Sequence, residues 1–318
     1  MLSYNKDINN IEEGLNHLRG KEYISESTVN FFRDIIRVQY KIKGQLHEID
    51  ISYSLTDDEV KEKMQKGNPL ISLDNMPLKE TLLKELFQEI CEIIKRQEDS
   101  ESEEIQKIID AESGGKLELE TLIKKLFFHD SVYFHSFSKN LKIGEDLLLF
   151  VAIHLARPFF EAVAERIKNK IADKVAYKVV GNPWLKNYCP VCGNGAQMAK
   201  LEKETGKRIL YCLLCGSEWV FMRVKCPFCC SEKQKSLRFL EEETGPYRID
   251  LCETCKRYIK TLDERKGGRD KEVLIPSVED LATMYLDILA EKEGYERSWF
   301  FPPSVDDLKA GEESKPLH

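Results

Sequence analysis

The chain has 318 residues, of which 42% are hydrophobic and 32% are charged, and its formal net charge is −7 at pH 7. This length exceeds that of most single domains and predicts at least two, with enough apolar residues for a real core. The acidic balance argues against a dedicated nucleic-acid binder, which normally carries a dense basic stripe. Only residues 185–265 are mildly basic, with 15 Lys and Arg against 11 Asp and Glu, so the rest of the chain carries −11.

No membrane span or export signal is expected. The longest apolar run, residues 147–156, includes His154 and is too short to cross a bilayer. The N-terminal residues lack the basic start and apolar stretch of a signal peptide. We therefore expect a cytoplasmic protein without membrane insertion. Thiols stay reduced in that compartment, so clustered cysteines predict metal ligands rather than disulfides.

The first part of the chain, residues 1–182, is predicted to be all-α. Apolar side chains recur at helical spacing in three segments, residues 27–40, 78–96 and 117–128. The acidic, serine-containing stretch 98–104 is expected to be a loop. A longer helical pattern runs from residue 145 to about 180 and contains Pro158, which either kinks the helix or begins a second one. Cys91 lies within an apolar stripe and is expected in the core.

After residue 182 the pattern changes to short β segments. Strands are predicted at residues 208–213, 218–224, 236–240 and 247–251. A final helix is expected at residues 278–293, with Ser277 and Asp280 forming a capping box at its start. The apolar tail at residues 299–303 is expected to dock on the body, with a partner-facing patch as the alternative.

Eight of the ten cysteines form four Cys-x-x-Cys pairs within 67 residues, separated by 19, 10 and 22 residues. Two cysteines at this spacing can direct both sulfurs at one ion, and two such turns complete a tetrahedral four-sulfur site. The intervals of 19 and 22 residues each suit a hairpin, which favours pairing of adjacent turns over an interleaved cross-brace. The predicted first site is Cys189, Cys192, Cys212 and Cys215, and the second is Cys226, Cys229, Cys252 and Cys255.

These ligands do not identify the metal. A closed four-thiolate site is usually structural and holds zinc, but the same ligands accept iron and then become redox-active. Cys230 stands where Gly193 and Gly216 follow other pairs, and it is a passive replacement, a free thiol or an alternative ligand. Elsewhere the six histidines show no spacing typical of a catalytic site, and His129, His135 and His154 are interpreted as structural. We expect no catalytic residues, no other cofactor site and no enzyme activity.

The predicted fold class is α+β: an all-α N-terminal domain, then two rubredoxin-like or zinc-ribbon-like β modules and a C-terminal helix. The predicted boundaries are 1–182 for the helical domain and 183–222 and 223–268 for the two four-cysteine ribbons. Residues 269–318 would form the C-terminal helix and tail and dock on the body.

The motifs in this order resemble the family of formate dehydrogenase accessory proteins, FdhE. The resemblance covers residues 145–296 well and the helical half loosely. It is carried by Leu155-Ala-Arg-Pro-Phe159, the four cysteine pairs, Ser217-Glu-Trp219, Arg223-Val-Lys225, Lys256-Arg-Tyr-Ile-Lys260, Asp280-Leu-Ala-Thr-Met-Tyr-Leu-Asp287 and Gly294-Tyr295. Cys230 departs from the glycine usual in the family, which puts the redox behaviour of the second site in doubt.

The resemblance implies a cytoplasmic maturation factor that binds the catalytic subunit of a respiratory formate dehydrogenase before that enzyme is exported. It also implies iron in the ribbon sites and a client with a pterin-bound molybdenum or tungsten, and it implies that this chain does not itself oxidise formate. Glu218, Trp219 and Arg223 are candidates for the client surface, although Trp219 is equally expected in the core. The alternatives are a zinc-ribbon module that binds nucleic acid and a small electron-transfer protein. Homodimerisation is left open.

Overall fold

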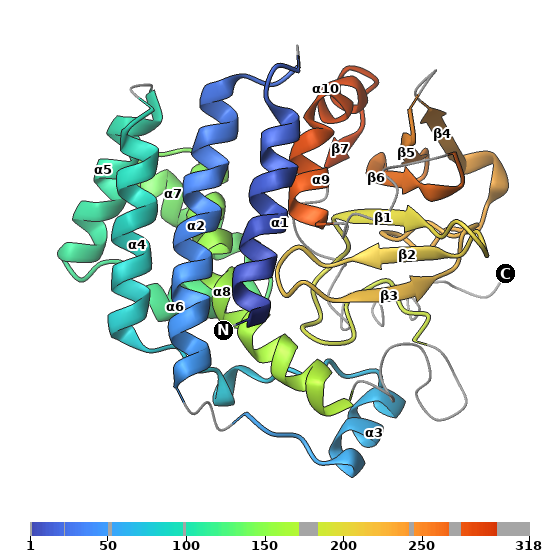
Figure 1. Cartoon of the computed structure of the whole chain (residues 1–318). Coiled ribbons are helices and arrows are strands. Elements are labelled where there is room, and N and C mark those ends of the chain that lie inside the picture. Colours follow the sequence, from blue (N-terminus) through green and yellow to red (C-terminus); the bar gives the residue numbers. More distant parts are fainter. Residues whose placement is uncertain are drawn as a thin grey trace, which may run out of the picture.

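The computed structural model describes residues 2–21, 23–49, 53–97, 100–171, 184–241, 245–266 and 275–297. A group of helices forms one side of the molecule and a curved sheet the other, with the last helices between them at one end (Figure 1). This arrangement confirms the predicted α+β class. The helices before the sheet are α1 Leu2–Leu18, α2 Glu26–Glu48, α3 Asp57–Lys66, α4 Glu80–Lys95, α5 Ser100–Ser113, α6 Leu119–Phe127, α7 Ser131–Leu141 and α8 Glu145–Ile171.

Helices α2, α4 and α8 pack together at the centre of the helical side. The predicted helices at 27–40, 78–96 and 117–128 correspond to α2, α4 and α6. Cys91, on the buried face of α4, is 1% exposed, as expected for a core residue. The loop expected at 98–104 is wrong from Ser100 onward, because this residue begins α5. The acidic side chains there suit the positive N-terminal end of a helix dipole, and Ile105 and Ile108 bury the face that follows.

Pro158 does not interrupt α8, which continues through it to Ile171. A proline inside a helix has no N–H to donate, so the carbonyl of His154, four residues earlier, loses its helical partner. Gln39 on α2 compensates, because its Nε2 donates to this carbonyl at 2.9 Å. The tertiary contact therefore satisfies the polar group that the proline leaves open.

Helix α8 is the one candidate membrane span in the described part of the chain. Its segment Glu145–Lys168 is long and apolar enough to cross a bilayer by length and composition alone, although 67% of its most apolar window is buried inside the protein. Such burial is typical of a core helix. The apolar run at residues 147–156 is one part of this longer helix.

The strands of both cysteine-containing regions form one sheet in the order β3-β2-β1-β6-β5-β4, with β7 beside β6 (Figure 1). Its two halves meet where β1 pairs in parallel with β6, with Met198 opposite Lys260. The remaining pairs are antiparallel except β6 with β7. The strands are β1 Met198–Leu201, β2 Arg208–Tyr211, β3 Glu218–Phe221, β4 Leu237–Glu241, β5 Tyr247–Cys252, β6 Arg257–Asp263 and β7 Glu296–Arg297. The four predicted strands are β2 to β5, whereas β1, β6 and β7 were not foreseen.

The single C-terminal helix expected at 278–293 is two helices, α9 Pro276–Ala282 and α10 Met284–Lys292. At the break between them, the buried Thr283 donates its hydroxyl hydrogen to the carbonyl of Glu279 at 2.7 Å. The predicted capping box is wrong: α9 begins after Ile275, with Pro276 in its first turn and no side-chain cap. The tail at 299–303 lies outside the described residues, and the predicted division into four segments stays a prediction.

Candidate metal centres

The structure brings the eight paired cysteines together in two groups of four. In the first centre, the sulfurs of Cys189 and Cys215 lie 3.6 Å apart and those of Cys192 and Cys212 lie 3.4 Å apart. In the second centre, the sulfurs of Cys226 and Cys255 lie 3.8 Å apart and those of Cys229 and Cys252 lie 3.7 Å apart. All four sulfurs of each centre lie within 4.8 Å of one another. Adjacent pairs therefore share a centre, and the interleaved arrangement is not formed.

The donor set fits a tetrahedral thiolate metal site. A metal–sulfur bond of about 2.3 Å places the sulfurs of a regular tetrahedron about 3.8 Å apart, close to the distances seen. A disulfide would require sulfurs about 2.05 Å apart. All ten cysteines fall within the described ranges and none is in a disulfide. The two groups can therefore hold two metal ions.

The four turns that carry the ligands share one backbone geometry. The residue after each second cysteine has a positive φ, at 80° for Gly193, 65° for Gly216, 57° for Cys230 and 54° for Lys256. In each turn the N–H of this residue donates to the carbonyl of the first cysteine, over 2.8 to 3.1 Å. In both turns that begin Cys-Pro, the second residue after the first cysteine also directs its N–H at that sulfur, over 3.4 Å. Such contacts stabilise negative charge on the sulfur.

Cys230 occupies the glycine position of its turn. It is not among the four sulfurs of the second centre, and burial raises the pKa of its thiol. A side chain at positive φ is strained by roughly 1–2 kcal/mol relative to ordinary backbone. These observations favour the passive interpretation, in which Cys230 adopts the conformation that the turn demands.

Replacing Cys230 by glycine should therefore stabilise the protein by about 1 kcal/mol and leave its metal content unchanged. Urea unfolding and elemental analysis of the purified variant would measure both. Gly193→Ala is the matched opposite, because its added Cβ would lie 2.8 Å from Cγ of Pro69 at a φ of 80°. Loss of one metal equivalent in Cys230→Gly would instead identify Cys230 as a ligand.

Without a cation, the buried first centre cannot hold four thiolates. Burial raises the pKa of Cys192 and of Cys212 well above the ordinary value. Burial also opposes ionisation of Cys215, but hydrogen bonds from the three neighbouring thiols hold its pKa well below the ordinary value. A divalent ion would offset the charge that burial disfavours, which is why thiolate sites bind metal and release protons together.

The two centres differ in their exposure to solvent. Every cysteine of the first centre is at most 4% exposed. In the second, Cys226 and Cys252 are buried, whereas Cys229 is exposed and Cys255 is intermediate. A hydrogen bond from Cys226 lowers the pKa of Cys255 to about 5. Solvent, chelators and redox partners can therefore reach the second centre but not the first.

The first centre is attached to the helical side of the molecule. The N–H groups of Leu70 and Ile71 donate to the carbonyls of Pro190 and Val191, at 3.0 and 2.7 Å. From the end of α8, Lys168 donates to the carbonyl of Gly216 at 2.6 Å. Buried helical residues and cysteines of both centres belong to one hydrophobic cluster. The first centre therefore connects the sheet to the helices.

An ion network around the buried Lys260 was not foreseen, although all of its residues except Arg297 lie in the motifs that carry the family resemblance. Lys260 on β6 is 1% exposed, and its Nζ lies 2.7 Å from carboxylate oxygens of both Asp280 and Asp287. Arg297 pairs with the same two carboxylates, and Tyr258 donates to Asp287 at 2.8 Å. The network fixes α9 and α10 to the sheet. Its signal in the sequence was the acidic pair Asp280 and Asp287 at helical spacing. Such a pair is equally typical of a solvent-exposed helix face.

The other residues singled out from the sequence have structural surroundings. Trp219 is 2% exposed and donates through Nε1 to the carbonyl of Lys186 at 2.9 Å, so it belongs to the core. Burial lowers the pKa of His129 to about 4 and that of His154 to about 3, so both rings are neutral at physiological pH. Exposed His135 lies 3.2 Å from a Glu145 carboxylate oxygen. Glu218 and Arg223 are exposed.

Comparison with known proteins supports the family resemblance. The sequence model of the FdhE C-terminal domain matches residues 224–302. An FdhE homolog from Aquifex aeolicus (strain VF5) is 30% identical over 281 residues, covering 86% of this chain and 88% of that one. FdhE from Escherichia coli (strain SMS-3-5 / SECEC) is 27% identical over 261 residues, covering 81% of this chain and 76% of that one.

The fold also matches a solved structure. The crystal structure of the FdhE protein from Pseudomonas aeruginosa superposes with a TM-score of 0.54 over 93% of both chains, at 17% identity. This likeness shows the fold alone. The long match to the Aquifex relative places the chain in the FdhE family of formate dehydrogenase accessory proteins.

Proposed function

We propose that this protein is a cytoplasmic maturation factor that binds the catalytic subunit of a respiratory formate dehydrogenase. It assists the assembly of that subunit, or sets the redox state of its active site, before export, and it is not itself an enzyme. The observation that carries the proposal is membership of a family of formate dehydrogenase accessory proteins over most of the chain. The two four-cysteine centres, one buried and one open to solvent, suit a stable scaffold with one accessible metal.

We further propose that the eight paired cysteines are the ligands of two metal ions, iron or zinc. Iron held by four thiolates can exchange one electron, whereas zinc has no redox chemistry. Anaerobic purification with elemental analysis and a visible spectrum distinguishes them, because thiolate iron absorbs visible light and zinc does not. Two equivalents of either metal would agree with the proposal, and a metal-free folded protein would contradict it.

Deleting the gene should abolish respiratory formate dehydrogenase activity, and expressing this chain should restore it. Formate-dependent dye reduction in membranes measures the activity, and co-purification with the tagged catalytic subunit measures the complex. An unrelated exported respiratory enzyme assayed in the same cells is the control for general export. Full formate dehydrogenase activity in the deletion strain, with no complex formed, would overturn the proposal.

A further inference from the structure

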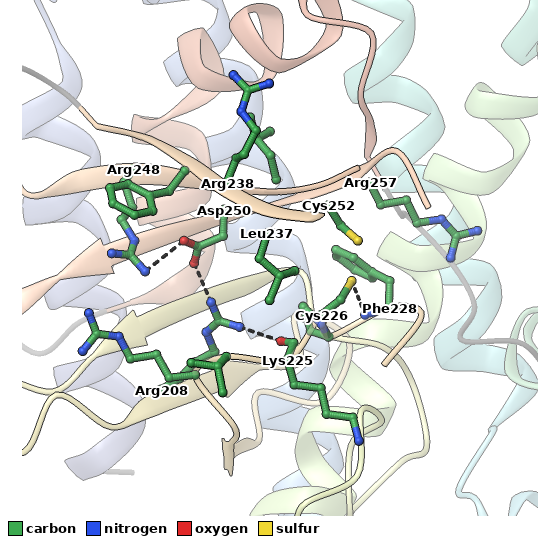
Figure 2. A pocket seen from close by; sticks show the side chains of 15 residues that line it. Arg208, Lys225, Cys226, Phe228, Leu237, Arg238, Arg248, Asp250, Cys252 and Arg257 are labelled. Atoms are coloured by element: carbon green, nitrogen blue, oxygen red, sulfur yellow. Dashed lines mark hydrogen bonds and ion pairs between the residues drawn. The ribbon is translucent and has the colours of Figure 1, made fainter. Parts of the chain in front are cut away.

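A basic pocket opens beside the second metal centre, on the side of the sheet formed by β2, β4 and β5 (Figure 2). Its volume is about 250 Å³, and Cys226 and Cys252 form part of its wall. Asp250 is its one acidic lining residue, and six lining residues are basic: Arg208, Arg223, Lys225, Arg238, Arg248 and Arg257. This concentration of positive charge stands out on a chain whose net charge is −7.

Two buried arginines share the one carboxylate of this pocket. Arg208 and Arg248 are 4% and 5% exposed, and each places a terminal guanidinium nitrogen 2.9 Å from an oxygen of Asp250 (Figure 2). The Nε atoms of both are buried without a hydrogen-bond partner in the described part of the chain. Buried donors are normally satisfied, and guanidinium groups bind oxyanions strongly. Glu241 lies outside the pocket lining, and its Oε1 is 4.0 Å from a terminal nitrogen of Arg248. An incoming carboxylate would add acceptors and charge to those of Asp250 and Glu241.

Arg223 adds a third guanidinium at the exposed mouth of the pocket. Burial and the nearby charges of Arg265, Arg248 and Arg208 lower its pKa, against the opposing charge of Asp263, so like charges outnumber opposite ones around it. Within the ranges described, Arg223 forms no ion pair, whereas Arg238 pairs with Glu253 at 2.9 Å. An anion placed between Arg223 and the buried pair would relieve this repulsion.

The second metal centre does not by itself explain the basic residues of the pocket. Four thiolates around a divalent ion leave a net charge of −2, which nearby cations offset. However, the guanidinium of Arg208 donates to the carbonyl of Lys225 and to Asp250, and that of Arg248 contacts Asp250. In the second centre the N–H of Phe228 contacts a sulfur. The arginines are thus directed at oxygen acceptors in the pocket.

The rim of the pocket carries exposed apolar side chains, which favours a polypeptide ligand over a bare inorganic anion. Val224 is 58% exposed and Phe239 is 55% exposed, and the guanidinium of Arg248 lies 4.9 Å from the centre of the Phe239 ring. Phe239 lies on β4, the last strand in the sheet order. Arginine and aromatic residues are enriched in protein interfaces, and an edge strand is a common place for a peptide to bind.

We propose that this pocket binds an acidic segment of the client polypeptide. Carboxylates of the segment would lie between Arg223 and the pair of Arg208 and Arg248, and a neighbouring apolar side chain would cover Phe239 and Val224. The identity of the client rests on the proposed function, whereas the chemistry of the ligand rests on the pocket. The bound segment would then lie beside the solvent-exposed metal centre.

Arg223→Glu in the full-length, metal-loaded protein tests the proposal. Because like charges surround Arg223, this variant should fold at least as stably as the parent. The matched control is Lys233→Glu, which makes the same change at an exposed residue that does not line the pocket. The probes are overlapping peptides of about 15 residues from the formate dehydrogenase catalytic subunit, long enough for an extended segment. Fluorescence anisotropy measures their binding.

We expect the peptides that bind to contain Asp or Glu next to an apolar residue. Arg223→Glu should weaken their binding at least tenfold, and Lys233→Glu by less than twofold. Phe239→Ser should also weaken it, and a peptide with the acidic residue changed to lysine should regain affinity for Arg223→Glu. Equal binding by Arg223→Glu and the parent would overturn the proposed role of the pocket, as would a preference of the pocket for RNA over these peptides.

The same measurements separate this proposal from the proposed function. If the parent binds neither the peptides nor the intact catalytic subunit, the proposed function itself fails. If the parent binds the subunit and Arg223→Glu binds it equally, only the proposed role of the pocket fails.

Discussion

Replacing Cys192 by serine should destabilise the whole protein, whereas Cys229→Ser should affect only the second centre. The two cysteines are equivalent in their turns, but Cys192 is 4% exposed and Cys229 is exposed to solvent. Metal binding contributes directly to folding in a closed thiolate site, so loss of the buried site should cost on the order of 5 kcal/mol. At the second centre, the serine hydroxyl or a water molecule can approach the metal from solvent.

Elemental analysis and urea unfolding followed by circular dichroism would measure this pair of variants. The expected result is a large fall in the free energy of unfolding for Cys192→Ser and a smaller one for Cys229→Ser. A chelator should likewise remove one equivalent of metal quickly, from the second centre, and the other slowly. Equal losses of stability in the two variants would show that burial does not distinguish the centres.

The metal centres could be predicted from the sequence because their geometry is local. A Cys-x-x-Cys turn fixes the relative positions of two sulfurs within four residues, and hairpins of similar length bring two turns together. The positive φ shared by Gly193 and Cys230 could be expected from the glycine of the first turn. By contrast, the difference in exposure between the centres depends on which one packs against the helices, and the spacing of cysteines contains no information on that.

The missed strands show where local patterns fail. In β6, Tyr258 to Leu262 are all buried, so the alternation that marks a strand with one exposed face is absent. Strand β1 is short and pairs in parallel with β6, which follows it by about 60 residues in the sequence. A pairing between such distant segments cannot be recognised from the residues next to either strand. Asp280 shows the same limitation in a helix. Its position suggests a capping partner for Ser277, but its carboxylate pairs with Lys260 on strand β6.

Replacing Lys260 by methionine should cost about 3–5 kcal/mol of stability, because it removes a fully buried cation and leaves two half-buried aspartates with one arginine. Lys256→Met is the matched control on the same ribbon. Its side chain is exposed and pairs with Glu253 at 2.5 Å, so its loss should cost less than about 1 kcal/mol. Removing the excess charge in the double variant Lys260→Met with Asp287→Asn should restore part of the stability. Urea unfolding of the three variants measures these differences. An unchanged free energy of unfolding in Lys260→Met would show that the fold does not depend on the network.

The pH dependence of stability provides an independent readout of the same network. Burial alone would raise the pKa of Asp280, but the charges of Arg297 and Lys260 hold it below its ordinary value of 3.8. A carboxyl whose pKa is lower in the folded than in the unfolded state stabilises the fold above the unfolded pKa, and this contribution is lost as the pH falls through the folded pKa. The parent should therefore lose this stability only below about pH 4, the unfolded pKa of Asp. In Lys260→Met the pKa of Asp280 rises because one of its two cations is gone, so the loss of stability below about pH 4 should be smaller and should end at a higher pH than in the parent. Coincident pH profiles for the parent and Lys260→Met would mean that Arg297 alone holds Asp280 ionised, and the lysine would then contribute to the fold chiefly through its packing.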